Sequence, residues 1–243
     1  TIDYGPYGWL EDYDPDWTPN TTDAEGRRYR FRNQPDIALW NLVQLGNALY
    51  PLIEDIASME QVLNSYSQQF DSQFPILQQQ KLGLQAEYDA HFQDELTTLL
   101  TASETDMTIF YRNLSNVEKT DTSDEALAKI TLAFYQPDKI VTTLQTSWLN
   151  WMELYLEKIK AEVGSDEERK QAMNTINPKY VLRNYMAQLA IEAAEKEDYT
   201  LIDELYTLLK NPYDEQPQYE KWFAKRPDWA RHKVGCSMLS CSS

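Results

Sequence analysis

A helical pattern that begins at Pro35 and continues almost to residue 210 constrains the fold of this chain more than any other feature. Proline is favoured at the first position of a helix, and Asp36 places a carboxylate in the first turn, so a helix is predicted to start here. The apolar residues that follow cover nearly its whole circumference: Ile37, Ala38, Leu39, Trp40, Leu42, Val43, Leu45 and Leu49. A helix that is apolar all round is stable only inside a core. The sequence therefore predicts a deeply buried helix, and a solvent-exposed 37–45 segment would contradict this burial.

Further helices are predicted along most of the remaining chain. Two or three fall within 58–118, and others fall at 124–135, 142–162, 182–193 and 201–209. Within 142–162, apolar side chains at spacings of three and four form a stripe that faces the core: Leu144, Trp148, Trp151, Tyr155 and Ile159. The pair Ser165 and Glu168 has the spacing of a capping box at the start of another short helix. With no repeat and no β-hairpin signal, the expected fold class is mainly α.

The first 34 residues lack a regular apolar period and are predicted to form a long loop. Seven acidic residues precede the first basic one: Asp3, Glu11, Asp12, Asp14, Asp16, Asp23 and Glu25. The charge then reverses at Arg27, Arg28, Arg30 and Arg32. Two interpretations stay open, since these arginines either organise the loop against phosphate or carboxylates, or belong to a solvated loop whose two ends attract each other.

The tripeptide Asp3-Tyr4-Gly5 is the strongest candidate for chemistry. Ile2 is interpreted as the end of a strand confined to Thr1–Tyr4, and Gly5 lets the backbone turn directly after Asp3. The tripeptide has the form of the kinase Asp-Phe-Gly motif, whose carboxylate holds Mg²⁺ on ATP phosphates. An ordinary Asp-x-Gly turn is the alternative.

Charge and composition exclude several classes of partner. The net charge of −17 repels nucleic acid and anionic membranes. No apolar run approaches the roughly 20 residues that span a bilayer. The only cysteines are Cys236 and Cys241, which do not have the spacing of a metal site, so a reducing cytoplasm is expected. His91 with Asp94 and Glu95 has a spacing that permits a shared metal, but a solvated helix face is the favoured interpretation.

Six blocks of residues, in order from the first residue to the last, resemble one known family. They are Thr1-Ile2-Asp3-Tyr4-Gly5-Pro6-Tyr7-Gly8, Phe31-Arg32-Asn33-Gln34-Pro35 with Ala38-Leu39-Trp40-Asn41-Leu42, Asn177-Pro178-Lys179-Tyr180-Val181-Leu182-Arg183-Asn184-Tyr185, Asn211-Pro212-Tyr213-Asp214-Glu215-Gln216-Pro217, Arg226-Pro227-Asp228-Trp229-Ala230, and Cys241-Ser242-Ser243. In these blocks the chain resembles the selenoprotein O (SelO) family of kinase-like proteins. The resemblance covers the whole chain but only the C-terminal half of the family's length.

The resemblance implies the helical C-lobe of a protein-kinase-like fold, beginning at the Asp-x-Gly metal motif. A solvent-exposed 37–45 segment would contradict this assignment to a kinase-like C-lobe as well as the predicted burial. It divides the chain into the motif and an activation-segment-like loop (1–34), the helical lobe (35–210) and a C-terminal strap (211–243). The glycine-rich loop, strand lysine, its glutamate partner and catalytic loop of such a fold are not found in this segment, so catalytic residues are expected upstream. The segment is interpreted as a fragment that is inactive by itself.

The family transfers AMP from ATP to Ser, Thr or Tyr hydroxyls of proteins, binding ATP in an orientation reversed from that of kinases. By resemblance, Asp3 binds ATP through Mg²⁺, with Mn²⁺ as the alternative ion, and the partners are protein substrates and ATP. The cytoplasm is the expected location, as for bacterial members, whereas eukaryotic relatives are mitochondrial. The competing hypothesis is a non-enzymatic, acidic, all-helical module that binds another protein.

Cys241 matches a position held by selenocysteine or cysteine in the family, which implies a redox role. In some members this residue pairs with a cysteine of the activation loop, but the loop here contains none. Cys236 is the only partner within the chain, a free reactive thiol at Cys241 is the other possibility, and a surface cysteine without function is the third. The strap is expected to be held by its aromatic side chains rather than by a disulfide to the loop: Tyr213, Tyr219, Trp222, Phe223 and Trp229.

Overall fold

The computed structural model describes residues 10–18, 26–86, 89–233 and 236. The predicted strand at Thr1–Tyr4, the Asp3 motif and Cys241 lie outside these residues. The described chain is mainly α-helical, as predicted, and its only β-structure consists of two isolated antiparallel bridges, Asp12 with Asp106 and Thr105 with Phe134.

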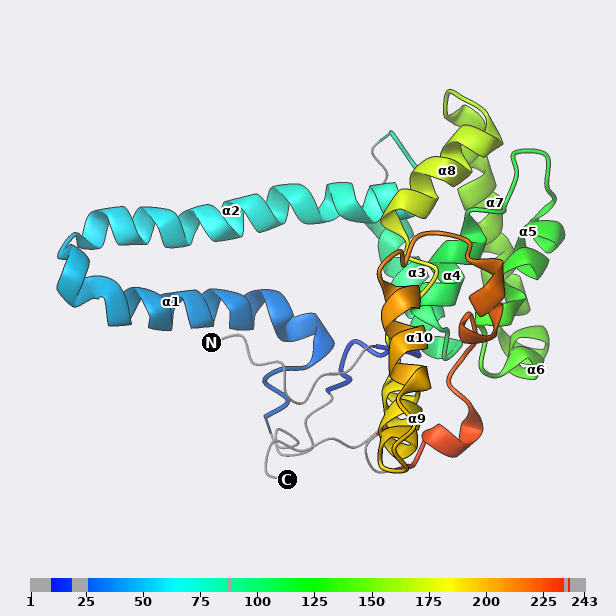
Figure 1. Ribbon diagram of the computed structural model, residues 1–243. Helices are drawn as coiled ribbons and strands as arrows, with labels where there is room; N and C mark the ends of the chain where they lie inside the picture. The colour runs from blue at the N-terminus through cyan, green and yellow to red at the C-terminus, as the bar shows by residue number, and fades with distance from the viewer. Residues whose placement is uncertain (1–9, 19–25, 87–88, 234–235, 237–243) are drawn as a thin grey trace. The chain divides into compact units, whose positions relative to one another are not determined.

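The helices fall where the sequence predicts them (Figure 1). Their bounds are α1 Gln34–Ile53, α2 Ile56–Lys81, α3 Ala90–Ala102, α4 Met107–Leu114, α5 Ser123–Ile130, α6 Pro137–Lys139, α7 Gln145–Ala161, α8 Asp166–Ile176, α9 Asn184–Ala194 and α10 Thr200–Leu209. Ser165 and Glu168 form the predicted capping box at the start of α8. A π-helical turn, Ile140–Leu144, separates α6 from α7.

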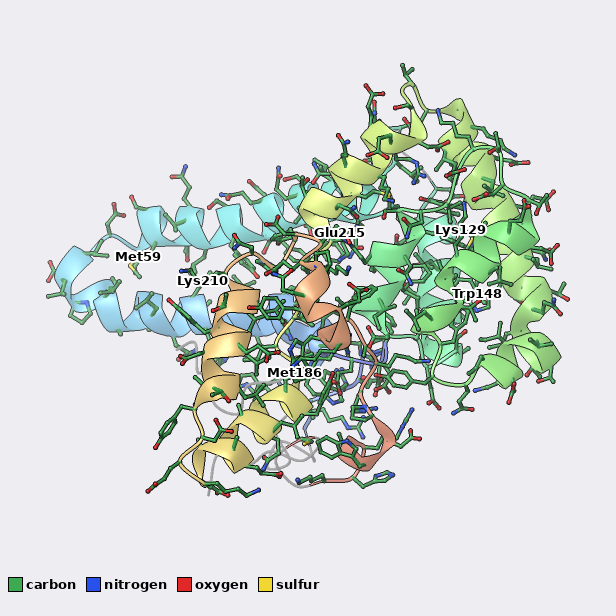
Figure 2. All side chains as sticks on the ribbon, turned by 45° about the vertical axis from the view of Figure 1, so that its right-hand side comes forward. Met59, Lys129, Trp148, Met186, Lys210 and Glu215 are labelled. Atoms are coloured by element: carbon green, nitrogen blue, oxygen red, sulfur yellow. The ribbon has the colours of Figure 1, made fainter. Side chains whose placement is uncertain are left out.

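The chain separates into two compact units, and the first comprises the described residues within 15–78. It contains a 3₁₀ turn at Phe31–Asn33, α1 and all but the last residues of α2. The two helices run antiparallel, because the Tyr66 hydroxyl donates to the Pro35 carbonyl at 3.0 Å while Met59, near the turn, lies against Gly46 (Figures 1 and 2). We call this pair the α1–α2 hairpin.

The prediction that the helix starting at Pro35 is deeply buried is wrong in this structure. No residue of α1 or α2 is buried. Large apolar side chains lie exposed along both helices: Trp40, Leu42, Leu45, Leu49, Tyr50, Leu52, Ile53, Ile56, Val62, Phe74, Ile76 and Leu77. The physical reason is that two helices can cover only one stripe of each other, whereas α1 is apolar around its circumference.

The second unit contains the described residues of 10–14 and 79–237, and it holds the hydrophobic core. Helix α7 packs against α3 and α5, and the predicted stripe faces inward, with Trp148, Trp151, Tyr155 and Ile159 at most 1% exposed. Phe92, Trp151 and Tyr155 stack in parallel, with centroids 5.0 and 5.3 Å apart. A second cluster of buried residues joins α9 and α10 to the strap.

Side chains hold the described part of the strap on the second unit, as predicted. Trp222 is buried and its indole nitrogen donates to Glu204 at 2.6 Å, while Tyr219 and Phe223 pack on the cluster beneath. Tyr213 and Trp229 instead remain nearly half exposed.

Candidate functional site

A buried ionic cluster holds residues 10–13, which follow the Asp3 motif in the sequence, against α4, Arg183 and the strap within the second unit. The Arg183 guanidinium donates to both oxygens of Asp106, with Nη1–Oδ2 and Nη2–Oδ1 distances of 2.6 and 2.9 Å. Arg226, from the strap, pairs with Glu11 at 3.1 Å and with Asp12 at 2.7 Å. We call these five residues the buried ionic cluster. Its bidentate geometry is the strong form of an arginine–carboxylate contact.

Backbone hydrogen bonds add a strand-like pairing beneath the cluster. The Tyr13 amide donates to the Thr105 carbonyl at 2.8 Å, and the Met107 amide donates to the Glu11 carbonyl at 3.1 Å. Asp106 is also the N-cap of α4, since its Oδ1 accepts from the Ile109 amide at 3.0 Å. One carboxylate thus caps a helix and neutralises a buried arginine.

Glu11 is the least well satisfied member of the cluster. Its side chain is only 4% exposed, and its Oε1 has no hydrogen-bond partner within the described structure; Arg183 Nη1 lies 3.8 Å from this oxygen. Burial raises the pKa of Glu11 to about 7, even though Arg226 and Arg183 both favour the ionised form. Desolvation therefore outweighs attraction here, and Glu11 titrates near neutrality.

Tyr135 links the cluster to the strap. Its hydroxyl accepts from the Arg226 amide at 3.0 Å and donates to Asp106 Oδ2 at 3.3 Å. Burial, reinforced by the neighbouring Asp106 charge, raises the pKa of Tyr135, so the hydroxyl stays a proton donor. The arrangement fixes the position of residues 11–13 beside Asp106 and Arg226.

The predicted site residues have different outcomes. Asp3 and Cys241 lie outside the described residues. Cys236 is a buried free thiol whose pKa is raised mainly by burial, and its carbonyl accepts from the Asn184 side chain at 2.8 Å. A raised pKa lowers the thiolate fraction and so the reactivity of Cys236 in this conformation.

The arginines of the loop pair with a carboxylate of the same loop. Arg30 and Arg32 contact Asp16 Oδ1 at 3.4 and 2.9 Å, and Arg27 donates to the Asp16 carbonyl at 3.4 Å. Arg28 lies over the ring of Trp40 at 3.7 Å from its centroid. Contacts with a carboxylate of the same loop fit both interpretations left open, the organising role and the attraction between the acidic and basic parts of the loop.

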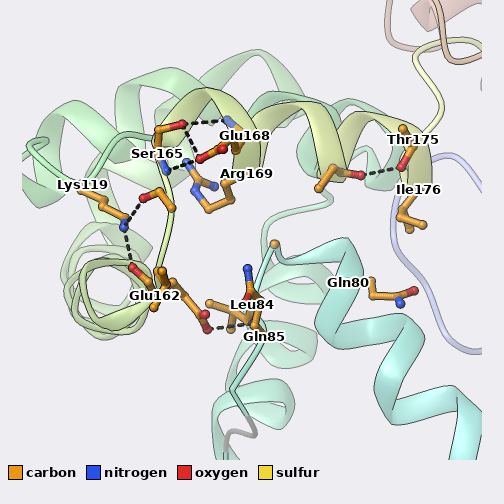
Figure 3. A pocket seen from close by; sticks show the side chains of 14 residues that line it. Gln80, Leu84, Gln85, Lys119, Glu162, Ser165, Glu168, Arg169, Thr175 and Ile176 are labelled. Carbon is orange, nitrogen blue, oxygen red and sulfur yellow. Dashed lines mark hydrogen bonds between the residues drawn. The ribbon is translucent and has the colours of Figure 1, made fainter.

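A cavity of about 540 Å³ lies in the second unit between α8 and the loops at residues 83–85 and 162–165 (Figure 3). Its polar side chains mostly bond one another or the local backbone: Lys119 donates to the Gly164 carbonyl at 2.9 Å, and Glu168 accepts from Ser165. Within the described residues, no group of three His, Cys, Asp or Glu side chains is placed to hold a metal ion. His91 instead forms an exposed pair with Glu95 at 3.2 Å.

Sequence reasoning placed Arg183 and Arg226 inside two of the family-like blocks but gave them no role. It missed Asp106 and Glu11 as partners, because the two carboxylates are 95 residues apart and only the fold brings them together. For Asp106 the sequence offers one signal, an aspartate at the N-cap position directly before an apolar helix. That pattern predicts a helix cap, but it does not show that a buried arginine lies beside the aspartate.

Comparison with known proteins gives the class of this chain. The family model described as protein adenylyltransferase SelO matches residues 1–210. A protein nucleotidyltransferase YdiU of Flavobacterium johnsoniae is 59% identical over 245 residues, a match that covers all of this chain and 47% of that protein. YdiU proteins of Rhodopirellula baltica and Aromatoleum aromaticum are 49% and 47% identical, with 47% and 46% of their lengths covered.

The relatives are all described as protein nucleotidyltransferases. The chain belongs to the SelO protein adenylyltransferase family, which confirms the resemblance found in the six sequence blocks. It spans about half the length of the curated relatives it matches. None of the helices in the described ranges is long and apolar enough to cross a membrane.

Proposed function

We propose that this chain is the C-terminal half of an ATP- and Mg²⁺-dependent protein adenylyltransferase that transfers AMP to Ser, Thr or Tyr hydroxyls of proteins. The observation that carries the proposal is the family match over residues 1–210, which includes the Asp3-Tyr4-Gly5 motif at its start. The partners would be ATP and protein substrates, and the cytoplasm would be the location.

Asp3 has the donor chemistry that the proposed site needs. A hard cation such as Mg²⁺ binds carboxylate oxygens, and when bound it would neutralise charge on the ATP phosphates. One carboxylate is too few to build such a site, so the remaining ligands and the catalytic residues belong to the preceding half in this proposal. A substrate hydroxyl would attack the α-phosphorus in line, with pyrophosphate as the leaving group.

The buried ionic cluster holds residues 10–13, the first described residues after Asp3 in the sequence. Arg183, Arg226 and the backbone of 105–107 bind this segment. We assign the cluster a positioning role. It contacts no substrate in this account.

The exposed α1–α2 hairpin bears on the proposed kinase-like C-lobe. Because α1 is exposed in this chain, the C-lobe is proposed only for the longer protein, in which the preceding half would cover the apolar surface. The same exposed surface favours the competing function, a helical module that binds another protein.

Cys241 remains a proposed redox residue. A disulfide with Cys236 would require the buried thiol of Cys236 to become accessible, because oxidation proceeds through the thiolate. Mass spectrometry of the non-reduced, digested chain would detect a linked Cys236–Cys241 peptide. Two free thiols after mild oxidation would remove Cys236 from this role.

The test of the proposed function is Asp3→Ala in the full-length protein, with Asp14→Ala as a control carboxylate of the same loop. Asp3→Ala is expected to lower incorporation of labelled AMP into protein by at least about 100-fold, because it removes a ligand of the metal that neutralises the reacting phosphates. The melting temperature should stay within a few degrees of the wild type. Retained transfer in Asp3→Ala would remove Asp3 from its role, and a collapsed melt would make it structural.

A further inference from the structure

Two buried cations meet at a single exposed carboxylate on the strap. Arg112 on α4 donates through Nη2 to Glu215 Oε1 at 2.6 Å, and Lys179 donates to Glu215 Oε2 at 2.9 Å. The side chains of Arg112 and Lys179 are 6% and 7% exposed, whereas that of Glu215 is 63% exposed. Figure 2 labels Glu215 on the segment that follows α10. The two positive charges, on Arg112 and Lys179, are therefore buried in the protein, whereas the negative charge on Glu215 is largely exposed to water.

Arg112 is held in place without Glu215. Its Nη1 donates to the carbonyls of Asn174 and Asn177 at 3.2 and 3.1 Å, and its Nη2 also donates to the Tyr213 carbonyl at 3.1 Å. Such a guanidinium would keep its orientation if the carboxylate moved away. A donor that is already oriented loses little conformational freedom when it binds an anion.

Lys179 is charged in this setting. Burial works against its charge, but hydrogen bonds with Glu220, at 2.7 Å, and with Glu215 outweigh this effect and raise the pKa of Lys179. Glu220 is itself 57% exposed. Both carboxylates that face Lys179 are therefore exposed enough to turn toward water.

A cavity of about 250 Å³ adjoins the two cations. Lys170 lines it and forms no ion pair within the described part of the chain, and Asn113 and Asn116 add amide groups. The cavity lining thus contains three cations and only two carboxylates: Arg112, Lys170 and Lys179 against Glu215 and Glu220. This volume exceeds that of a few water molecules, at about 30 Å³ each, so it has room for a small polyatomic anion.

We propose that this cavity is a binding site for a phosphate-class oxyanion, and that the Glu215 carboxylate occupies its charged end when no anion is bound. Two oxygens on one phosphorus present nearly the same pair of acceptors as the two carboxylate oxygens of Glu215, one of which accepts from Arg112 and the other from Lys179. The ligand is either a free phosphate or pyrophosphate ion, or the phosphoryl group of a larger molecule. Binding of the anion and the Glu215 contact exclude each other.

The test is titration calorimetry of this chain at low ionic strength with inorganic phosphate, pyrophosphate and AMP in separate arms. Wild type is expected to bind weakly, and Glu215→Gln about tenfold more tightly, because the internal competitor is lost. Lys170→Gln should weaken binding several-fold. Glu192→Gln, which alters a partly exposed carboxylate of α9 paired with Lys233, should leave anion binding unchanged. Binding of the inorganic ions alone would assign the site to free anions, and tighter binding of AMP would assign it to a phosphoryl group on a larger molecule.

A second measurement keeps the proposal testable if Glu215→Gln does not fold. Phosphate should raise the melting temperature of the wild type above that in chloride of equal ionic strength, and Lys170→Gln should lose most of this shift. The absence of both calorimetric binding and a phosphate-specific shift would overturn the proposal. So would binding that Lys170→Gln and Glu215→Gln leave unchanged.

Discussion

Asp106 is the residue on which most of the buried polar structure depends. It caps α4, pairs with Arg183 through both oxygens and accepts from Tyr135. Removing one partner of a buried pair is costly because it leaves an uncompensated charge behind. Asp89 offers a matched comparison, since it caps α3 through the His91 amide but is exposed.

Asp106→Ala is therefore expected to lower the free energy of unfolding by about 3–5 kcal/mol, whereas Asp89→Ala should cost about 1 kcal/mol. Urea denaturation followed by circular dichroism measures both. Equal losses in the two variants would mean that the Arg183 contact adds nothing to the cap.

Glu11 makes the stability of the chain depend on pH. A carboxyl whose pKa rises from 4.5 to about 7 on folding binds protons more tightly in the native state. Its contribution is complete below pH 4.5 and is lost as the pH rises through about 7. A shift of this size corresponds to roughly 3 kcal/mol.

The variant Glu11→Gln removes this titration. Between pH 5 and pH 8 the free energy of unfolding of the wild type should fall relative to Glu11→Gln by up to roughly 3 kcal/mol, measured in urea at each pH. The other titrating groups are common to both proteins and cancel in the difference. A constant difference across this range would show that Glu11 does not titrate as the structure implies.

The positions of the helices could be predicted from the sequence, but their burial could be predicted only in part. The stripe of α7 and the caps of α8 follow from local spacing, because each depends on neighbours three or four residues away. The burial of α1 does not follow from local spacing. A helix that is apolar around its circumference needs a core to cover it, but its own sequence does not say which residues would form that core. The buried ionic cluster was unpredictable for the same reason, since its members come from four distant parts of the chain.

Two tryptophans on different helices test this contrast. Trp148 on α7 is completely buried and its indole donates to Ser103 at 2.8 Å, whereas Trp40 on α1 is 43% exposed. Trp148→Ala should cost about 3–5 kcal/mol of unfolding free energy in this chain. Trp40→Ala should cost less, about 1–2 kcal/mol, because it loses the contact with Arg28 and only partial burial of its ring.

In a full-length protein the cost of Trp40→Ala should rise toward that of Trp148→Ala if the preceding half covers α1. Thermal melts of both variants in both lengths of protein measure this. A small effect of Trp40→Ala in each length would mean that the hairpin stays exposed, which would favour the protein-binding module.

For the whole molecule, the sequence already indicated family, fold class and the incompleteness of the site. The family is confirmed by the family match, and the mainly α-helical class is confirmed by the structure, whereas the kinase-like C-lobe stays a prediction. The role of Asp3 as a metal ligand stays a prediction, because a short Asp-x-Gly motif does not show which other side chains would complete a metal site. In the function proposed above, this chain would contribute one metal ligand to a site whose other residues belong to the preceding half.

The most direct test compares incorporation of labelled AMP by this chain alone, by a full-length protein, and by this chain mixed with the separately expressed preceding half. The account predicts no transfer by the chain alone, transfer by the full-length protein, and at least partial recovery in the mixture. Transfer by the chain alone would contradict the claim that its site is incomplete, and a full-length protein without transfer would contradict the proposed activity.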